Sequence, residues 1–472
     1  MKKTLGIFAF SCLSLLTASA FAAAPAWLDV AVSAESANTV EMRRHLHANP
    51  ELGNQEKQTQ AYIVQKLKEF GVDEVLVGYK NSPTAVIGVI NPKKGNAIGL
   101  RADIDALPIK ENTGLAFESK AKGKMWGKTS DVSHMCGHDM HMAMLLSAAR
   151  ILAAHKEDVP RKVVLVFQPA EEGDSITNPF VTDNPKLSGA RALVEDGLIE
   201  KYDIKQMYGI HVMARVPAGK MLVAQGTALN SADAFQIDIE GRQAHGAMPW
   251  TGVDATLAAA QTVVALQQIV ARNVNLTQGM GVITVGKLQA GETGNVMAGS
   301  ASMLGTIRAN HNTIRSKLLE RIPQVADGTA KAAGAVARTK LIEIYPVTVN
   351  DPALAGRITK ELKVYGVDAQ ISDWNPGASE DFSFYAQKVP SVFMFLGGDP
   401  KDAKNAPNNH SDKFSPDESA MPAGVRGSHR RGNDAGQITF KTKWAESECF
   451  KIGLKNVKNL KNSAQHNSSY VE

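Results

Sequence analysis

The sequence predicts an α/β fold in which helices cover both faces of a mixed sheet, with a smaller ferredoxin-like α+β unit inserted into it. Two observations predict this class. Apolar strand patterns alternate with amphipathic helices in the first half of the chain, and a second set of strands and helices follows in a different order. A chain of 472 residues is long enough for about two to three domains.

The first half of the chain contains short runs rich in Val, Ile and Leu. Runs of this kind are typical of buried strands, whereas apolar residues that recur every three or four positions are typical of helices. Their alternation predicts a parallel or mixed sheet between two layers of helices. The expected strands are 85–90, 97–101 and 162–167, and the expected helices are 39–47, 59–70 and 141–155.

A second unit begins near Gly226. Its elements follow the order strand, helix, strand, strand, helix, strand, which is the split βαβ pattern of ferredoxin-like units. The expected elements are strands 235–239, 281–288, 302–308 and 339–345 and helices 254–272 and 313–333. The predicted organisation is a signal peptide (1–22), a catalytic domain in two parts (23–225 and 341–426), an inserted lid or dimerisation domain (226–340) and an atypical basic tail (427–472).

The N-terminus resembles a signal peptide. Lys2 and Lys3 precede a short apolar run, and Ala20-Phe21-Ala22 forms a small-residue cleavage site. We therefore expect a mature protein that starts near Ala23 and is secreted across the inner membrane, into the periplasm of a Gram-negative cell and otherwise to the outside. No later segment has the length of a membrane span, so we expect no membrane partner.

Charge and cysteine content exclude two classes of protein. The net charge of +5 comes from residues 421–472, with nine Lys/Arg and four Asp/Glu, and the rest of the chain is balanced. We therefore expect no nucleic-acid partner. Once Cys12 leaves with the signal peptide, only Cys136 and Cys449 remain, which is too few for a disulfide scaffold.

Metal-ligating residue types stand where the predicted strands end. Cys136 and His138 alternate, so both side chains can reach one ion if the segment is extended at a strand-to-helix junction. Glu171 and Glu172 follow a buried strand, so one carboxylate can bind metal while the other takes a proton from water. His211 ends another apolar strand.

A fifth candidate ligand, His410, lies in a polar loop. Taken singly, each of these histidines is more often a surface or hydrogen-bonded core residue, and Cys136 is more often a small buried apolar residue. Together the five ligands exceed the four that a structural zinc ion needs, and they fit two ions. Thiolate, imidazole and carboxylate suit two divalent ions per subunit, as Zn²⁺, Mn²⁺, Co²⁺ or Ni²⁺.

Over residues 36 to 426 the chain resembles the metal-dependent aminoacylase/carboxypeptidase-type amidohydrolases, in the branch that contains hippurate hydrolases and the plant auxin-conjugate (IAA-amino acid) hydrolases. The resemblance implies a zinc-exopeptidase-like catalytic domain. The motifs that carry it are Arg43-Arg44 to His47, Pro50-Glu51-Leu52-Gly53, Arg101-Ala102-Asp103-Ile104-Asp105-Ala106-Leu107-Pro108, Cys136-Gly137-His138-Asp139, Phe167-Gln168-Pro169-Ala170-Glu171-Glu172, Ala244-His245-Gly246-Ala247-Met248-Pro249, Gly305-Thr306-Ile307-Arg308, Glu380-Asp381-Phe382 and His410.

The resemblance implies roles for the matched residues in the catalytic domain. Glu171 is similar to the family's general base, which later acts as an acid, and Asp105 to the residue that orients a ligand. A structural alternative for Asp105 is a carboxylate that caps the turn after a strand. The family's metal ligands match Cys136, as the bridging ligand, and His138, Glu172, His211 and His410.

In the inserted domain the resemblance implies three further roles. His245 is similar to a histidine that reaches a neighbouring subunit's active site and stabilises the oxyanion, which implies a homodimer or larger homo-oligomer. Asn295 and Arg308 resemble residues that hold the substrate carboxylate. For Arg308 the structural alternative is a salt bridge within the lid.

The function expected from the sequence is an exported amidohydrolase that cleaves the amide bond of N-acyl amino acids, such as hippurate-like, N-acetyl or auxin-conjugate-like substrates, by metal-activated water. One alternative is a metallopeptidase that acts on dipeptides or terminal residues, because the same ligands serve that reaction. Another, from a different class, is a non-catalytic metal-binding or solute-binding protein. Retention of all five ligands and of Glu171 argues against this second alternative.

Overall fold

The computed structural model describes residues 24–182, 186–400 and 405–428. The predicted signal peptide and nearly all of the predicted C-terminal tail lie outside these ranges. None of the helices within them is long and apolar enough to cross a membrane.

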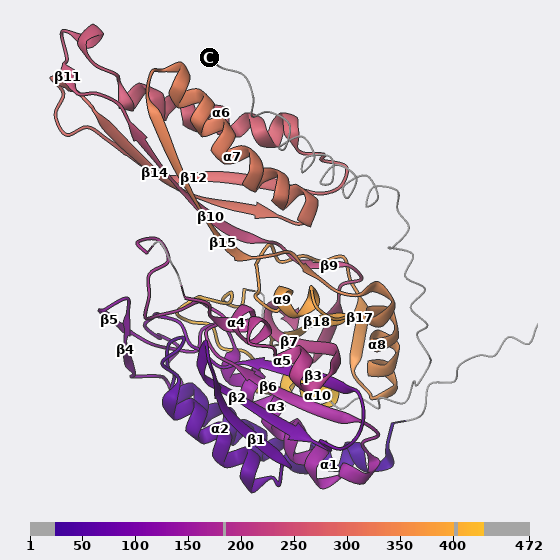
Figure 1. The fold of residues 1–472 in the computed structure, drawn as a ribbon. Helices are drawn as coiled ribbons and strands as arrows, with labels where there is room; N and C mark the ends of the chain where they lie inside the picture. Colours follow the sequence, from indigo (N-terminus) through magenta and orange to yellow (C-terminus); the bar gives the residue numbers. More distant parts are fainter. Residues whose placement is uncertain (1–23, 183–185, 401–404, 429–472) are drawn as a thin grey trace, which may run out of the picture. The chain divides into compact units, whose positions relative to one another are not determined.

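Eight strands form one mixed sheet in the order β1-β2-β6-β3-β7-β18-β8-β17 (Figure 1). Its four central strands, β6, β3, β7 and β18, run parallel, so their carboxyl ends meet at one edge. The strands are β1 (Glu74–Tyr79), β2 (Ser82–Ile90), β3 (Ala97–Asp103), β6 (Lys162–Gln168), β7 (Ile204–Pro217), β8 (Lys220–Val223), β17 (Asp368–Ile371) and β18 (Ser391–Asp399).

Helices cover both faces of this sheet, and the alternation along β2 shows why. Val86 and Ile90 pack in one apolar cluster, while Ala85, Ile87 and Val89 pack in the other. The first cluster includes residues of α1 (Ala26–Ala48), α2 (Lys57–Glu69), α3 (His138–Ala154), α8 (Pro352–Val364) and α10 (Met421–Ser428), and the second includes residues of α4 (Gly189–Glu195), α5 (Leu198–Tyr202) and α9 (Ser383–Ala386). The predicted fold class is confirmed.

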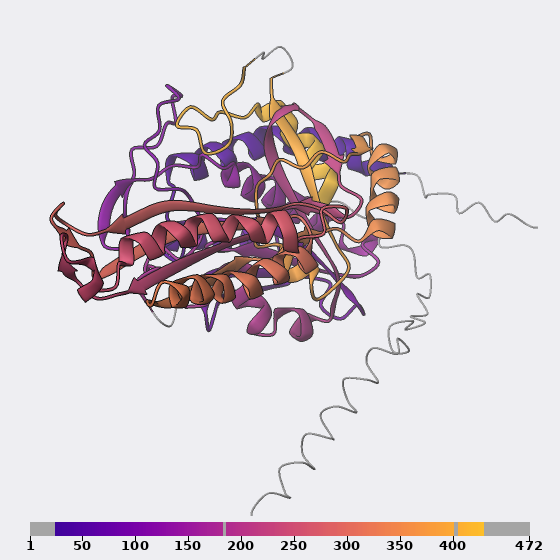
Figure 2. The same cartoon turned by 90° about the horizontal axis from the view of Figure 1, so that it is seen from above.

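A separate antiparallel sheet has the order β12-β14-β10-β15, and α6 and α7 lie side by side along it (Figures 1 and 2). Its own apolar cluster joins the strands to the helices. The elements are β10 (Ala232–Glu240), α6 (Ala255–Asn273), β12 (Gly281–Ala290), β14 (Ser300–Ala309), α7 (Asn312–Ala332) and β15 (Val336–Tyr345). This is the predicted ferredoxin-like order of elements, while the domain boundaries stay predictions.

Several elements were not expected from the sequence. The first helix begins at Ala26 rather than near Thr39, because Leu28 and Val32 are buried in the first cluster. The edge strands β1 and β17 are short, as is β8 beside β17, and β18 pairs with residues of β7 that are distant in the chain. The remaining small elements are β4 (Lys122–Met125), β5 (Lys128–Asp131), β9 (Thr227–Leu229), β11 (Ala244–His245), β13 (Val296–Met297), β16 (Thr348–Val349) and the 3-10 turns Lys156–Asp158, Pro249–Thr251 and Glu418–Ala420.

Candidate metal centre

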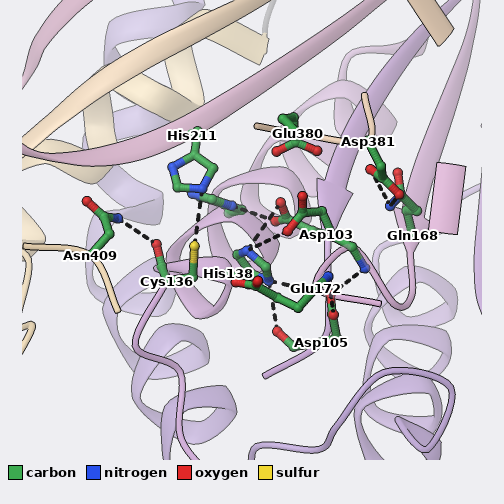
Figure 3. A network of polar contacts seen from close by, with 12 residues as sticks. Asp103, Asp105, Cys136, His138, Gln168, Glu172, His211, Glu380, Asp381 and Asn409 are labelled. Carbon is green, nitrogen blue, oxygen red and sulfur yellow. Dashed lines mark hydrogen bonds and ion pairs between the residues drawn. The ribbon is translucent and has the colours of Figure 1, made fainter. Parts of the chain in front are cut away.

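Five side chains converge around the carboxyl edge of the parallel strands in two groups that share one thiol. The first group is Cys136, His138 and His211, and the second is Cys136, Glu172 and His410. Within each group the ligand atoms lie within 4.8 Å of one another. The structure therefore brings together all five side chains proposed as ligands from the sequence, with Cys136 common to both groups. Figure 3 shows Cys136 with His138, Glu172 and His211 around it.

The turn that carries Cys136 and His138 differs from the extended segment expected from their alternation. Gly137 has a φ of +106°, and His138 is already the first residue of α3. The expectation of an extended segment across these residues is therefore wrong. A left-handed residue turns the chain between the two ligands, and glycine adopts this conformation without steric cost.

Backbone carbonyls fix the tautomers of two histidines. The Nδ1 atom of His138 lies 2.8 Å from the carbonyl oxygen of Asp105, and that of His211 lies 2.9 Å from the carbonyl oxygen of Val212. A carbonyl oxygen only accepts, so Nδ1 carries the proton in both rings and Nε2 presents a lone pair. Among the described residues, Nε2 of His138 has no hydrogen-bond partner. Nε2 of His211 lies 3.4 Å from the sulfur of Cys136, and the unpaired lone pair of His138 beside this thiol fits a bound metal ion.

The second group is more exposed to solvent than the first. Nε2 of the exposed His410 lies 3.2 Å from the sulfur of Cys136 and 3.1 Å from a carboxylate oxygen of Glu172. The backbone N–H of His410 donates to the carbonyl of Met135 at 2.7 Å, and this bond ties the loop to the chain beside Cys136. Sulfur, imidazole and carboxylate together form a donor set suited to Zn²⁺, Mn²⁺, Co²⁺ or Ni²⁺.

Asp105 connects the two segments that carry the ligands. Its carboxylate accepts the backbone N–H of Glu171 at 3.0 Å and that of Glu172 at 2.8 Å, while its carbonyl accepts from His138. Asp105 is fully buried. It thus contacts the backbone of one candidate ligand and the ring of another, as expected for a residue that orients ligands.

The electrostatics of the centre favour added positive charge. Burial raises the pKa of the Cys136 thiol well above its usual value, and the carboxylates of Glu172 and Glu171 raise it further. Burial likewise raises the pKa of Glu171, with a further contribution from the nearby Glu380. A divalent cation at this point would reverse the effect on the thiol, because it stabilises the thiolate.

A layer of buried residues behind the candidate ligands was assigned no role from the sequence. Arg101 donates to Asp103 at 2.7 Å and to Glu380 at 2.8 Å. Asp103 also lies 2.5 Å from Nδ1 of His141, and Nε2 of His141 accepts the N–H of Val212, next to His211, at 2.8 Å. Only the motifs that contain Arg101, Asp103 and Glu380 signalled this layer in the sequence.

Three predicted site residues lie outside this cluster. His245 is exposed in β11, where its ring accepts the N–H of Ala247. Asn295 is also exposed, and its backbone carbonyl accepts the N–H of Gly246 at 2.9 Å. Arg308 is half-buried in β14 and donates to the carbonyl of Ile307. No ion pair of Arg308 occurs within the described parts of the chain, so the structure does not support its structural alternative of a lid salt bridge.

The sheet carries a buried thiol, imidazoles and carboxylates at its carboxyl edge. One carboxyl group, that of Glu171, is not among the five proposed ligands and can act as a base. This combination is typical of metal-dependent hydrolases. The family is shown by comparison. The model of "Peptidase family M20/M25/M40" matches residues 99–430, and the chain belongs to this family. It is therefore a hydrolase, and the family resemblance found in the sequence is confirmed.

The similar proteins are named for different hydrolytic activities. A "Thermostable carboxypeptidase 1" of Saccharolobus solfataricus is 33% identical over 82% of this chain and 92% of its own. A "Hippurate hydrolase" of Campylobacter jejuni is 37% identical over 75% of this chain and 87% of its own. The crystal structure of the Bacillus subtilis YXEP protein, described as a dinuclear metal binding peptidase from the M20 family, is similar with a TM-score of 0.67 and 30% identity, over 84% of this chain and 96% of its own.

Proposed function

We propose that the protein is an exported dinuclear-metal amidohydrolase that cleaves the amide bond of N-acyl amino acids. The observation that carries the proposal is the pair of ligand groups that share Cys136, with the buried carboxyl group of Glu171 3.9 Å from His138. Similarity to the Campylobacter jejuni hippurate hydrolase supports the substrate class, and similarity to the dinuclear Bacillus subtilis protein supports two ions.

The chain's own residues supply the proton transfers. Bound divalent ions would polarise the scissile carbonyl and acidify the attacking water. Glu171 is buried, and its carboxylate lies 3.9 Å from Nε2 of His138, so it stands among the candidate ligands without being needed as one. We assign it the role of accepting the proton of the water and delivering it to the leaving amine nitrogen. Burial and the nearby Glu380 raise the pKa of Glu171, which makes its carboxylate a stronger proton acceptor for the first step.

We propose that His245 acts in the active site of a second copy of the chain. His245 belongs to none of the ligand groups found among the described residues, and it is exposed in β11. We therefore propose a homodimer or larger homo-oligomer in which His245 stabilises the oxyanion in a neighbouring site, while Asn295 and Arg308 bind the substrate carboxylate. The molar mass of the purified protein in solution tests the assembly.

The alternative reaction is cleavage of dipeptides or of terminal residues. It is favoured by the similarity to the carboxypeptidase of Saccharolobus solfataricus, and the ligand set serves both reactions because each breaks an amide. A non-catalytic binding protein fits less well, since metal storage has no use for the buried carboxyl group of Glu171 beside the ligands. Export rests on Lys2, Lys3 and Ala20-Phe21-Ala22, and the N-terminal sequence of the mature protein tests it.

The test is a substrate panel. The purified protein is incubated with hippurate, N-acetyl amino acids and dipeptides in the presence of Zn²⁺, Mn²⁺, Co²⁺ or a chelator, and the release of free amine is followed. We expect chelator-sensitive release from acyl amino acids. Release from dipeptides alone would establish the peptidase alternative, and a folded, metal-loaded protein that cleaves nothing would overturn both reactions.

A further inference from the structure

The turn that carries Glu171 and Glu172 begins at a strained residue. Ala170 has a φ of +54°, a left-handed conformation that costs a non-glycine residue roughly 1 kcal/mol or more. Such a residue persists only where its surroundings hold it in place. Asp105 accepts the two amides that follow, and the hydroxyl group of Tyr345 donates to the carbonyl of Glu171. The amide of Ala170 itself is held by another part of the chain.

That amide donates to Glu56, 114 residues earlier in the sequence. The distance from the Ala170 nitrogen to Oε1 of Glu56 is 2.9 Å, and Oε2 of Glu56 accepts the hydroxyl of Thr84 at 2.6 Å. Glu56 is fully buried, and Thr84 and Ala170 are nearly so. Burying a carboxyl group costs free energy. Glu56 is nevertheless buried here with one hydrogen bond to each of its carboxylate oxygens, which indicates a specific role for this side chain.

Local helix structure does not explain the placement of Glu56. It occupies the N-cap position of α2, but its side chain makes no capping hydrogen bond. Glu51 caps the helix instead, because its carboxylate accepts hydrogen bonds from the backbone N–H and the hydroxyl group of Thr59. The Glu56 side chain is therefore directed away from its own helix and toward the turn.

The chain around Glu56 is also fitted to the turn. A Cβ atom added at Gly53 would lie 2.3 Å from the carbonyl oxygen of Gly173 and 3.1 Å from the Cβ of Ala170. Only glycine permits this approach. The carbonyl of Gly53 in turn accepts the backbone N–H of Ser175. The segment from Gly53 to Glu56 thus packs directly against the turn, which gives the Pro50-Glu51-Leu52-Gly53 motif a structural purpose.

We propose that Glu56 is a positioning residue, which holds the amide of Ala170 and so keeps Glu171 and Glu172 directed into the metal centre without itself touching substrate. The inference rests on the proposed function, because it assigns Glu56 to the residues that hold the general base. Loss of this hydrogen bond would leave the buried N–H unsatisfied and let Ala170 relax toward an unstrained conformation.

The test compares variants of the two residues in this pocket, in the full chain loaded with Co²⁺. We expect Glu56→Leu to lower kcat for hippurate by about 100-fold with little change in KM, since a misplacement of about 1 Å has this effect. The visible absorption of the bound Co²⁺ is expected to shift, because Glu172 is a ligand. Glu56→Gln keeps an oxygen for the Ala170 amide and an amide group for Thr84, so its kcat should stay within about threefold of wild type.

Thr84→Val is the matched control, because it removes the other partner of the same carboxyl group. We expect it to lower the thermal unfolding temperature while preserving kcat and the Co²⁺ spectrum. If Glu56→Leu fails to fold, Glu56→Asp carries the same prediction, since its shorter side chain does not reach Ala170. Wild-type kcat and spectrum in the Leu or Asp variant, or equal loss in the Leu, Gln and Thr84→Val variants, would overturn the proposal. A wild-type protein that cleaves no substrate refutes the proposed function instead, and the Co²⁺ spectrum still tests Glu56.

Discussion

Two buried polar clusters meet at the start of α3, and they differ in how their charges are paired. In the first, Asp139 accepts from Arg43 at 2.7 Å and lies 2.9 Å from Nδ1 of His47, whose Nε2 lies 2.9 Å from Glu111. Glu418 also accepts from Arg43 at 3.1 Å and from Arg44 at 2.7 Å, so three cations face three carboxylates. In the second, around Cys136 and His138, ring lone pairs and carboxylates converge with too few donors to satisfy them.

The difference separates a structural cluster from a binding site. Although burial opposes it, the charge of Asp139 raises the pKa of His47 to about 9, so the paired cluster keeps its cation at neutral pH. Such a network balances its own charges and needs no added cation. The metal centre is complete only with added cations, because buried carboxylates and lone pairs without partners are costly. The two clusters are adjacent in the sequence, because His138 belongs to the candidate metal centre and Asp139 to the paired cluster.

The largest expected effect comes from breaking the metal centre. Glu171→Gln should lower kcat by about 10²- to 10⁴-fold and leave the metal content unchanged, since in the proposed mechanism Glu171 carries a proton and is not a ligand. Cys136→Ala should lower both kcat and the metal content measured by mass spectrometry, because the two groups share its sulfur. As a control, His134→Gln should leave the metal content unchanged, although His134 lies in the same segment. Near-wild-type turnover in Glu171→Gln would contradict the assignment.

Breaking the paired cluster should affect stability instead. Arg43 is nearly fully buried, so Arg43→Met leaves Asp139 with too little positive charge. We expect the free energy of unfolding to fall by about 3–5 kcal/mol, as for other buried ion pairs that lose one partner. Urea unfolding measures this. A loss below about 1 kcal/mol would show that the pair is not structural.

The pH dependence of stability sharpens the same comparison. The pKa of His47 is about 9 in the folded protein and near its usual 6.5 when unfolded. Its contribution is therefore fully present below pH 6.5 and is lost as the pH rises through 9. We expect a loss of about 3 kcal/mol over this window, measured as the difference between wild type and His47→Gln. A difference that does not change with pH would contradict the protonated state of His47.

The smallest effect on the free energy of unfolding is expected for a change at Arg44, the residue after Arg43. Arg44 binds the carboxylate of Glu418 through two hydrogen bonds, at 3.0 and 2.7 Å, but half of its side chain is exposed. Arg44→Ala should therefore cost less than about 1 kcal/mol in urea unfolding, because solvent screens such pairs. The neighbouring arginines provide a matched pair: a cost for Arg44→Ala as large as that for Arg43→Met would show that burial does not decide the outcome.

Local sequence was sufficient for the fold class and for the candidate ligands. Periodicity indicated the strands and helices, since alternation and helical spacing are properties of short segments. Cys136, Glu172 and His211 stand beside or within recognisable strands and helices, so their types and positions could be read along the chain. The helix start at His138 was misplaced, because the left-handed turn at Gly137 depends on its neighbours in space.

Tertiary structure alone decided how those ligands are held. The bond between Glu56 and Ala170 joins residues 114 positions apart, and the pair of Arg43 and Asp139 spans 96. No local pattern identifies such partners, because a hydrogen bond depends on distances of a few ångströms that only the folded chain sets. The sequence by itself identified the candidate groups for the chemistry, because residue types and their order are local. The fold determined which of their lone pairs, charges and backbone amides are left free or bound.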